Sequence, residues 1–568
     1  MSITKSQTEN IESIFNANRF IIPAYQRKYS WTDKERIALW KDIEESIKDG
    51  MNHFLGTLSF QETKSSGLST DKLYEIIDGQ QRITTLFILL KVLIDKLEDK
   101  EIRQGQLGVF IGSKNNLKLQ PLGDDGEFLN KLLFEFANIN KDEINKRSQK
   151  FMYSAVILFT AFTNALKSEE IKDMIIFIKD KIDVLVFNVE KEEQAVKMFS
   201  IINDRGLPLR ILDKTKSVLM LYSTLHLNKQ LNEQINKGFE NIFDSYDDIL
   251  LSEEKLKILD NFDENTIFAH HYYSSRKLFP TTWSNKDFAE KIFNNLKIMC
   301  DELKGNSEKL YEFITHYLED LQNFAIHYSS MIKEIETKQS FQKPFRFLKF
   351  SLYLYPLIVR LYMQNKLDDL LPLLEKIDIR VYKLRGKRKL FADMYLLSSR
   401  ISETDMTVDE IKVELIKFND KFVNDHVFRT YLDSEMYENG AVKYILAEFN
   451  NDEIDINTYK DLQVEHIFSR DPNFDVSAFG FKEDYDYEKN RIGNLGLLES
   501  LLNEGLFNFP PKNKVSGYIK SKILNTRNLA GIIEKENYSK QNVDDRRKLI
   551  IDFSIDRFGM DKQHNKNT

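Results

Sequence analysis

Four polar side chains near the C-terminal end of the 568-residue chain combine one carboxylate, one imidazole and two amides: Glu465, His466, Asn494 and Asn503. An imidazole can act as a general base because its pKa lies near neutral pH. A hard cation such as Mg²⁺, held by oxygen ligands, can neutralise a scissile phosphate and stabilise the leaving oxygen. The residue types therefore indicate a one-metal site for phosphodiester hydrolysis.

Short apolar segments are expected to position these side chains. The stretch from Asp461 to His466 predicts a strand that ends in Glu465 and His466, and Asn494 opens a second strand. Asn503, nine residues after Asn494, falls in the helix that follows. If the strands pair as a hairpin, both amides come near the end of the first strand. The alternative is a structural histidine with ordinary turn asparagines; the ordered set of four favours the site.

A second polar group, Asp78-Gly79-Gln80-Gln81-Arg82, lies between a predicted strand from Leu73 to Asp78 and a predicted helix. Free backbone N–H groups and the helix dipole favour an anion at such a position. Arg82 can add a forked contact to a phosphate. Most turns of this kind are only turns, so the pattern by itself leaves a binding role open.

The remaining predicted strands and helices carry no motif that indicates a particular chemistry. Segments of apolar and β-branched residues predict strands from Phe54 to Phe60 and from Asp183 to Val189. After Arg82, apolar residues at helical spacing predict an amphipathic helix with one apolar face: Ile83, Leu86, Phe87, Leu90, Leu93, Ile94 and Leu97. Residues from about 215 to 450 predict successive helices without a chemical motif. One basic run among them is interpreted as a solvated face, with a phosphate-contacting patch as the alternative: Lys383, Arg385, Lys387, Arg388 and Lys389.

Composition narrows the class of protein. Hydrophobic residues make up 42% and charged residues 30% of the chain, which is typical of a globular protein. The single cysteine, Cys300, excludes an internal disulfide and a multi-cysteine zinc site, and we expect it to be a buried small hydrophobic residue in a reducing compartment. The polar N-terminal segment and the lack of a stretch of ~20 apolar residues predict a cytoplasmic protein. The net charge of −7 predicts no overall attraction to nucleic acid, although a local positive track suffices for a nuclease.

The C-terminal segment resembles the HNH (ββα-metal) nucleases, and more closely the HNH-like C-terminal domain of GmrSD-type, modification-dependent restriction enzymes. The matching residues are EHI from Glu465, R-x-G-N-L-x-L-L from Arg491 to Leu498, Asn503, and K-x-x-x-Y-x-x-S at Lys514, Tyr518 and Ser521. One position departs from the family, which has a proline in H-I-x-P where this chain has His466-Ile467-Phe468-Ser469. We interpret this as a variation of the loop, because the chemical side chains are all present.

This resemblance implies a role for each residue of the C-terminal group. His466 is the general base, and Asn494 holds the loop of the histidine in place. Glu465 and Asn503 are the ligands of a divalent metal ion, Mg²⁺ or alternatively Mn²⁺. Arg491 and Lys514 are phosphate contacts or structural contacts.

The N-terminal part resembles the N-terminal domain of the same family. The matching segments are IPAYQRKYSW from Ile22, FLGT from Phe54, IIDGQQRITTL from Ile76 and F-x-x-I-N-D-R-G from Phe199. The resemblance implies a ParB/sulfiredoxin-like fold, which in several relatives binds and hydrolyses nucleoside triphosphates. Carried over onto the matching positions, the nucleotide- or DNA-facing site comprises Gln26, Arg27, Asp78, Gly79, Gln80, Gln81, Arg82, Asn203 and Arg205, with Asp213 and Lys216 as secondary candidates.

Together these features predict a predominantly helical α+β protein of three domains. Residues 1–225 form a ParB/sulfiredoxin-like α/β domain that senses nucleotide or DNA, and residues 226–430 form a helical connector. Residues 431–568 form an HNH-like ββα-metal nuclease domain embedded in helices.

The functional hypothesis is a metal-dependent endonuclease of an anti-phage restriction system. Its expected partners are double-stranded, modified phage DNA, a nucleoside triphosphate that gates cleavage, and either further copies of the chain or a second defence protein, with no membrane. Two alternatives stay open. One is an NTP-hydrolysing regulatory or DNA-binding protein whose HNH-like domain is inactive, and the other is a helical scaffold that acts through a partner.

Overall fold

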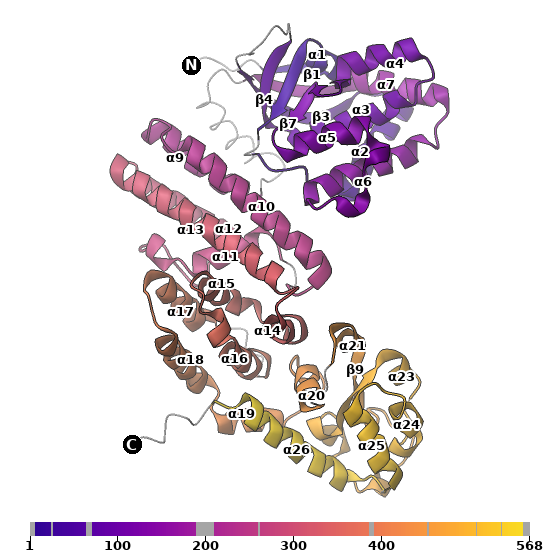
Figure 1. Ribbon diagram of the computed structural model, residues 1–568, viewed down its shortest axis with the longest axis vertical. Helices are drawn as coiled ribbons and strands as arrows, with labels where there is room; N and C mark the ends of the chain where they lie inside the picture. The colour runs from indigo at the N-terminus through magenta and orange to yellow at the C-terminus, as the bar shows by residue number, and fades with distance from the viewer. Residues whose placement is uncertain are drawn as a thin grey trace. The chain divides into compact units, whose positions relative to one another are not determined.

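The computed structural model describes residues 6–23, 26–63, 71–188, 210–259, 262–384, 391–450, 454–506, 508–535 and 537–560. Most of these residues are helical, and their strands form one six-stranded sheet and two two-stranded sheets (Figure 1). The predicted class, a predominantly helical α+β protein, is confirmed. Within the described ranges, none of the helices combines the length and the apolar character needed to cross a membrane.

The chain divides into two compact units. The N-terminal unit comprises Met1–Leu251, Asp263–Phe268 and Phe288–Ser329, and the C-terminal unit comprises Ser252–Phe262, Ala269–Asp287 and Ser330–Thr568. Residues of the expected connector, 226–430, contribute to both units. The division into three domains stays a prediction.

The N-terminal unit contains a mixed sheet with the strand order β1-β8-β3-β4-β2-β7. Pairs β1/β8 and β3/β4 are antiparallel, whereas β3/β8, β2/β4 and β2/β7 are parallel. The strands are Ser6–Asn10 (β1), Asn18–Ile22 (β2), His53–Thr63 (β3), Lys72–Asp78 (β4), Leu119–Pro121 (β7) and Ile182–Asn188 (β8), with a separate pair Gly112–Ser113 (β5) and Asn116–Leu117 (β6). The three strands predicted from the sequence correspond to β3, β4 and β8, although Val189 lies outside the described residues.

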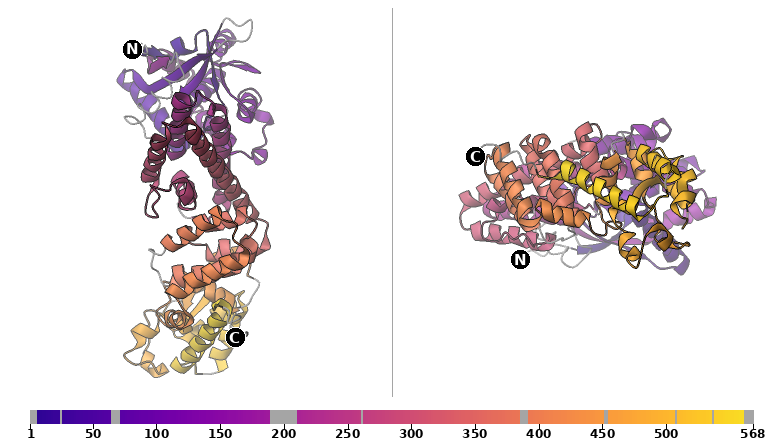
Figure 2. Two further views of the ribbon diagram at one scale, coloured as in Figure 1. Left: turned by 90° about the vertical axis from the view of Figure 1, so that its left-hand side faces the viewer. Right: turned by 90° about the horizontal axis from the view of Figure 1, so that it is seen from below.

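Helices pack beside this sheet (Figures 1 and 2). They are Ile11–Phe15 (α1), Asp33–Asp49 (α2), Gln80–Asp95 (α3), Lys100–Gln106 (α4), Asp124–Phe134 (α5), Arg147–Thr163 (α6) and Ser168–Lys181 (α7). Helix α3 follows β4 as predicted, but all its residues from Ile83 to Ile94 are buried. The expectation of a single apolar face was therefore wrong, because α3 contacts α4, α6 and α7 while it also joins the core of the sheet.

Further helices begin in the N-terminal unit: Ile211–His226 (α9), Asn232–Leu256 (α10), Glu264–Tyr273 (α11), Ala289–Leu303 (α12) and Ser307–Glu334 (α13). Of these, α10, α11 and α13 end in the C-terminal unit. Helix α9 packs on α12, and α10 approaches α13 where Gly238 faces Leu318. Cys300 of α12 is buried, and burial raises the pKa of its thiol. The thiol is thus the small buried group that the sequence predicted.

The described residues of the C-terminal unit are mainly helical. Its helices are Gln339–Phe341 (α14), Tyr355–Met363 (α15), Leu367–Ile377 (α16), Phe391–Glu403 (α17), Val408–Phe422 (α18), Asp425–Leu432 (α19), Val442–Asn450 (α20), Ile456–Asp461 (α21), Tyr485–Glu488 (α22), Ser500–Glu504 (α23), Pro511–Tyr518 (α24), Leu524–Lys535 (α25) and Lys540–Phe558 (α26). The strands of this unit in the described residues are Leu462–His466 (β9) and Leu495–Glu499 (β10).

The basic run of the helical middle is described at one residue, Lys383. Its ammonium donates to the Lys349 carbonyl at 2.8 Å and lies 3.6 Å from Asp378 Oδ2. These contacts hold the side chain against its own unit. The other residues of the run, Arg385, Lys387, Arg388 and Lys389, lie outside the described residues.

At Gly493, the turn before β10 packs closely against α26. A Cβ atom at Gly493 would overlap the Val543 carbonyl and lie 2.6 Å from Cβ of Arg547. We therefore expect Gly493→Ala to lower the free energy of unfolding by about 1–3 kcal/mol, because a tightly packed contact does not accept an added methyl group. Chemical denaturation measures the change. Gly496→Ala is the matched control, since nothing lies within 4 Å of a Cβ at Gly496; equal losses in both variants contradict the prediction.

Candidate functional site

Strands β9 and β10 pair antiparallel, with His466 opposite Leu495 and Glu465 opposite Gly496. Helix α23 follows β10 directly, so the predicted order of strand, strand and helix is present. Asn494 immediately precedes β10, and Asn503 lies in α23. Side chains alternate along a strand, so the neighbours Glu465 and His466 point to opposite faces of β9.

Glu465 is held inside the protein by a cation and a hydroxyl group. Its Oε1 accepts hydrogen bonds from Lys514 Nζ at 2.7 Å and from the Tyr518 hydroxyl at 3.0 Å, whereas Oε2 has no hydrogen-bond partner among the described residues. Lys514 also donates to the His466 carbonyl at 2.6 Å. Burial lowers the pKa of Lys514, and the Glu465 carboxylate opposes this shift. One ammonium group thus fixes both the carboxylate and the backbone at the end of β9.

The K-x-x-x-Y-x-x-S segment binds the acidic side chains of both strands. Lys514 and Tyr518 contact Glu465 at the end of β9, and Ser521 Oγ donates to Glu499 Oε2 at the end of β10, at 2.8 Å. Lys514 is only 1% exposed. Its burial supports the structural role that the sequence left open beside a phosphate contact.

Arg491, like Lys514, forms ion pairs with acidic side chains of its own unit. It donates to Glu488 Oε1 at 2.8 Å and pairs with Asp433. Burial acts to lower the pKa of Arg491, but these two carboxylates raise it above the ordinary value. Arg547 of α26 pairs with the same two acids. The shared network ties the turn before β10 to α26 and supports a structural role for Arg491 as well.

The imidazole of His466 has two neighbours that the sequence did not single out. Its Nε2 lies 3.1 Å from Asn490 Oδ1, and its ring centroid lies 4.2 Å from that of Tyr437. The backbone carbonyl of Asn490 accepts hydrogen bonds from the backbone N–H groups of Met436 and Tyr437, at 2.8 Å and 3.2 Å. Burial lowers the pKa of His466 to about 4, so the ring is neutral at neutral pH. Asn490 adjoins the R-x-G-N motif and was a detectable candidate, whereas Tyr437 carries no local signal.

Asn494 binds the loop that follows His466 through both ends of its amide. Its Oδ1 accepts from the Phe468 N–H at 2.8 Å, and its Nδ2 donates to the Phe468 and Lys489 carbonyls at 2.8 Å and 2.9 Å. Arg546 clamps the turn around Asn494, because its Nη1 donates to the carbonyls of Gly493 and Leu495 at 2.9 Å and 2.6 Å.

Ser469 stands where the resemblance expects a proline. It is buried, its hydroxyl donates to the Phe509 carbonyl at 3.1 Å, and its carbonyl accepts from the Tyr485 hydroxyl. The preceding Phe468 packs against aromatic rings on several sides: Phe479, Phe481 and Tyr538. Hydrogen bonds and ring packing therefore hold this loop in place of a proline ring.

The fourth residue of the group, Asn503, contacts Gln463 and not Glu465. Its Nδ2 donates to Gln463 Oε1 at 2.8 Å. Gln463 lies two residues before Glu465, on the same face of β9. In the described part of the chain, no cluster of three or more His, Cys, Asp or Glu side chains could hold a metal ion. A carboxylate and an amide oxygen still suit Mg²⁺, which keeps several water ligands and takes others from substrate phosphates.

In the N-terminal unit, the two glutamines of the Asp78–Arg82 group bind the backbone of the segment 26–30. Gln80 Nε2 donates to the Arg27 carbonyl at 2.8 Å, and Gln81 exchanges hydrogen bonds with the Lys28 carbonyl and the Ser30 N–H at 3.1 Å and 2.8 Å. Gln26 Nε2 reaches back to the carbonyls of residues 76 and 77. The two motifs that the sequence singled out thus hold one another in place.

Arg82 points to another side of this turn. Its Nη2 lies 3.4 Å from Asp78 Oδ2, and its Nη1 lies 3.4 Å from the Leu55 carbonyl. Gly56, at φ +109°, makes room for this guanidinium, since a Cβ there would overlap Arg82 Nη1. Gly79, at φ +92°, is the N-cap residue that immediately precedes α3. Burial raises the pKa of Asp78, although Arg82 opposes the shift.

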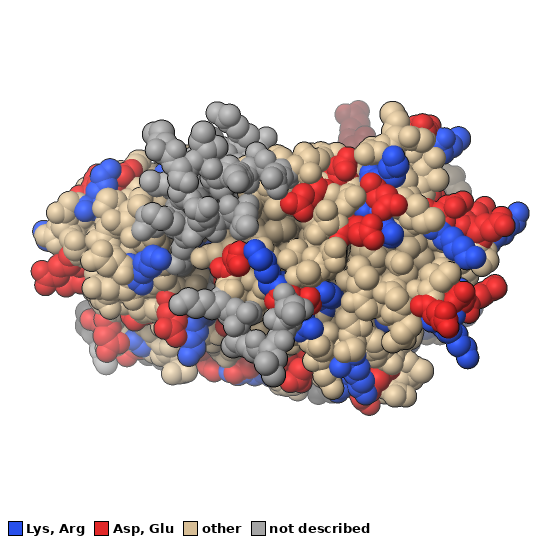
Figure 3. Space-filling view, turned by 90° about the horizontal axis from the view of Figure 1, so that it is seen from above, with Lys and Arg blue, Asp and Glu red and all other residues tan. Residues whose placement is uncertain are grey.

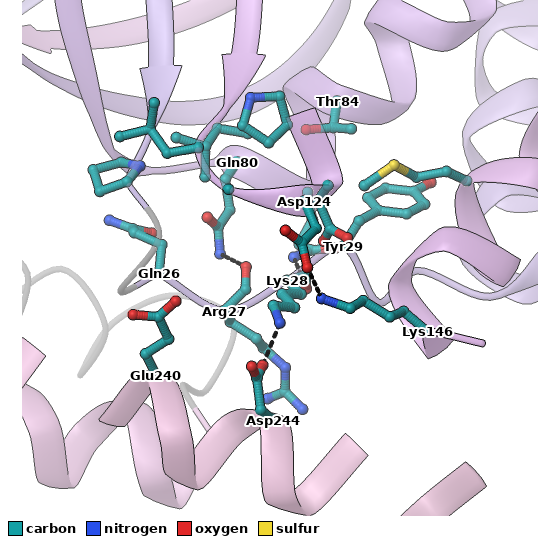
Figure 4. Close-up of a pocket in the computed structure, with 18 residues that line it drawn as sticks. Gln26, Arg27, Lys28, Tyr29, Gln80, Thr84, Asp124, Lys146, Glu240 and Asp244 are labelled. Carbon is teal, nitrogen blue, oxygen red and sulfur yellow. Dashed lines mark hydrogen bonds and ion pairs between the residues drawn. The ribbon is translucent and has the colours of Figure 1, made fainter. Parts of the chain in front are cut away.

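A cavity of about 150 Å³ lies beside the segment 26–29 (Figure 4). Four of the predicted residues line it: Gln26, Arg27, Gln80 and Gln81. The sequence missed its acidic lining, which comes from two helices: Asp124 and Asp125 of α5, and Glu240 and Asp244 of α10. The buried Gln80 Oε1 has no hydrogen-bond partner among the described residues. Asp78, Gly79 and Arg82 are not among the lining residues, so the predicted group is divided.

Of the other residues predicted for this site, two lie outside the described residues and two have contacts in the structure. Asn203 and Arg205 lie outside the described residues. Asp213 Oδ2 lies 3.6 Å from Arg27 Nη1, and burial raises the pKa of Asp213 to about 6. Burial lowers the pKa of Lys216 to about 7, against the influence of Asp213. Asp213 therefore belongs to the charged surroundings of Arg27, and Lys216 interacts with Asp213.

The face of the molecule in Figure 3 carries acidic and basic side chains interspersed with one another. This mixture agrees with the net charge of −7. A nucleic-acid backbone favours a continuous positive track, and the described residues of this face do not form one.

Comparison with known families defines the class of protein as a restriction endonuclease. Residues 11–220 match the N-terminal domain of the GmrSD restriction endonuclease, and residues 417–553 match the C-terminal domain of the GmrSD restriction endonucleases. The chain therefore belongs to the GmrSD restriction endonuclease family, and the resemblance seen in the sequence is confirmed. A search of curated proteins found no match. Membership of this family implies a nuclease that binds DNA.

The Lys514–Glu465 ion pair predicts a measurable loss of stability when it is broken. Lys514→Met leaves a buried carboxylate without its cation, and we expect the free energy of unfolding to fall by about 3 kcal/mol. Denaturant titration of the full chain measures the effect. Lys512→Met, on the exposed side of α24, is the control and should change stability by less than about 0.5 kcal/mol. Similar values for the two variants would show that the ion pair does not hold the strand.

Proposed function

We propose that the chain is a DNA endonuclease of the HNH type and that its C-terminal unit cuts DNA at the end of β9. The observation that carries the proposal is the position of the His466 imidazole at the strand end, beside Asn490 and Tyr437, where burial lowers the pKa of the ring and favours its neutral form. A neutral ring has a free electron pair and can take a proton from an attacking water. With Nε2 engaged by Asn490, Nδ1 is the nitrogen that accepts this proton.

Other residues of the unit orient this base. Asn494 fixes the loop after His466 through Phe468, and Lys514 fixes the His466 carbonyl. Asn490 sets the angle of the ring. These residues act through His466 and its backbone, so they position the base and do not react themselves.

A divalent metal ion, Mg²⁺ or Mn²⁺, is the second part of the proposal, and it would be held at the end of β9 on the face opposite to the His466 ring. Glu465 would hold it through Oε2, the carboxylate oxygen that Lys514 and Tyr518 leave without a partner. Asn503 of α23 would add its amide oxygen, since it binds Gln463 on the same face of β9 as Glu465. When bound, such an ion neutralises the scissile phosphate and stabilises the leaving oxygen. Lys514 keeps the carboxylate in a fixed orientation for this purpose.

The N-terminal unit is the proposed sensor. Its ParB/sulfiredoxin-like fold would bind a nucleoside triphosphate in the cavity beside Gln26, Arg27, Gln80 and Gln81, and binding or hydrolysis would gate cleavage of modified phage DNA in the cytoplasm. The cavity among the motif residues supports the nucleotide site. The restriction endonuclease family supports a defence role.

His466→Ala tests the nuclease proposal. Loss of the general base should lower the rate of Mg²⁺-dependent cleavage by about 10²- to 10⁴-fold, while thermal denaturation shows an intact fold. Cleavage is measured on plasmid DNA and on modified phage DNA. His426→Ala changes an exposed histidine of the same unit and should cut normally. Full activity in the His466 variant rules out His466 as the base.

A second candidate is an NTP-hydrolysing regulator with an inactive C-terminal site, and one observation favours it. The Glu465 carboxylate already pairs with the Lys514 ammonium. This candidate expects NTP turnover, abolished by Arg27→Ala in the lining of the cavity, without cleavage of any DNA.

A panel of DNA substrates separates the two candidates. Unmodified, hydroxymethylated, glucosylated and phosphorothioated DNA are each incubated with and without NTP and metal ion. The endonuclease proposal expects cleavage of at least one modified substrate, dependent on metal and stimulated by NTP. NTP turnover with every DNA left intact would instead establish the regulator.

A further inference from the structure

The two cations of the N-terminal motif, Arg27 and Lys28, are covered by acidic side chains from three helices. Asp213 comes from the first turn of α9, Asp244 from α10, and Glu264 from the start of α11. All three belong to the N-terminal unit. We call these three residues the acidic cover.

Arg27 interacts with two of the three acidic side chains, Asp213 and Glu264. Its side chain is 8% exposed, forms an ion pair with Glu264 and lies 3.6 Å from Asp213 Oδ2. Burial acts to lower the pKa of Arg27, but Glu264, Asp213 and Asp247 together raise it above the ordinary value. The guanidinium that the family resemblance places in the nucleotide- or DNA-facing site is therefore already paired with carboxylates.

Lys28 is covered from α10. It forms an ion pair with Asp244, drawn as a dashed line in Figure 4, where both side chains meet at the edge of the cavity. Glu240, one turn earlier on α10, lines the same cavity. A triphosphate that approaches Lys28 would meet these carboxylates at close range, and like charges repel.

Each carboxylate of the acidic cover has either a second cation nearby or access to solvent when it separates from Arg27 or Lys28. Glu264 also accepts from Arg210 Nη1 at 3.3 Å. Lys216, on the same helix as Asp213, attracts the Asp213 carboxylate. The Asp244 side chain is 41% exposed and can return to water. The cover can therefore be released without leaving a buried charge unpaired.

We propose that the acidic cover occupies Arg27 and Lys28 as an internal competitor of phosphate, so that anion binding and the contact of α9, α10 and α11 with these residues exclude one another. This proposal rests on the nucleotide site proposed above and adds its regulation. A nucleotide that binds must detach the carboxylates of these helices, which turns occupancy of the cavity into a change at α10.

Isothermal titration of the full chain with inorganic tripolyphosphate, and with ATP, GTP, CTP and UTP, tests the cover. Asp244→Asn should tighten binding of tripolyphosphate about five-fold, because it removes one competing charge at a partly exposed ion pair. Glu233→Gln removes one charge from the exposed first turn of the same helix and should leave the affinity unchanged. In a Lys28→Gln background, Asp244→Asn should have no effect, since the cation for which carboxylate and phosphate compete is gone.

The outcomes separate the cover from the nucleotide site. Binding by the wild type that Asp244→Asn leaves unchanged overturns the cover and keeps the nucleotide site. Equal tightening by Asp244→Asn and Glu233→Gln also overturns the cover, because it reflects overall charge. Absence of binding by the wild type and by Asp244→Asn alike overturns both proposals.

Discussion

The ion pair between Lys514 and Glu465 fixes the end of β9, and the candidate nuclease site depends on it. A charge removed from water must be paired inside the protein, because an isolated buried charge is strongly unfavourable. Lys514 is buried in α24 and meets this requirement by binding Glu465 and the His466 carbonyl together. Tyr518, one turn later on the same helix, binds the same carboxylate oxygen. The packing of α24 thus determines where Glu465 and His466 lie.

The same constraint applies in the N-terminal unit, but there the candidate binding residue is a buried cation and its partners are carboxylates. There the buried group with a functional prospect is a cation, Arg27, and acids of three helices satisfy it. In both units a side chain that the sequence offers to a ligand is engaged by the protein itself. The difference lies in the charged partners: one ammonium group pairs with Glu465, whereas the carboxylates of Glu264 and Asp213 both lie against Arg27.

Loops that carry functional residues are held here by side chains rather than by backbone shape. Asn494 spans the loop after His466, and Ser469 with the aromatic rings around Phe468 replaces the proline of the family. In the N-terminal unit, Gln80 and Gln81 hold the backbone of the segment 26–30. Amide side chains suit this task because each offers both a donor and an acceptor. Several residues of the family motifs therefore maintain the geometry of the sites.

Features that depend on local patterns and on the order of residue types could be predicted from the amino-acid sequence. It predicted the α+β class, the positions of β3, β4, β8, β9 and β10, and the family, because strand and helix periods and motif order are contained in neighbouring residues. Tertiary structure alone decided that α3 is buried on every side, that Asn490 and Tyr437 flank His466, and that Asn503 meets Gln463. It also decided that carboxylates of α9, α10 and α11 cover Arg27 and Lys28. These contacts join residues far apart in the chain, and they follow from how whole elements pack and which charges that packing removes from water.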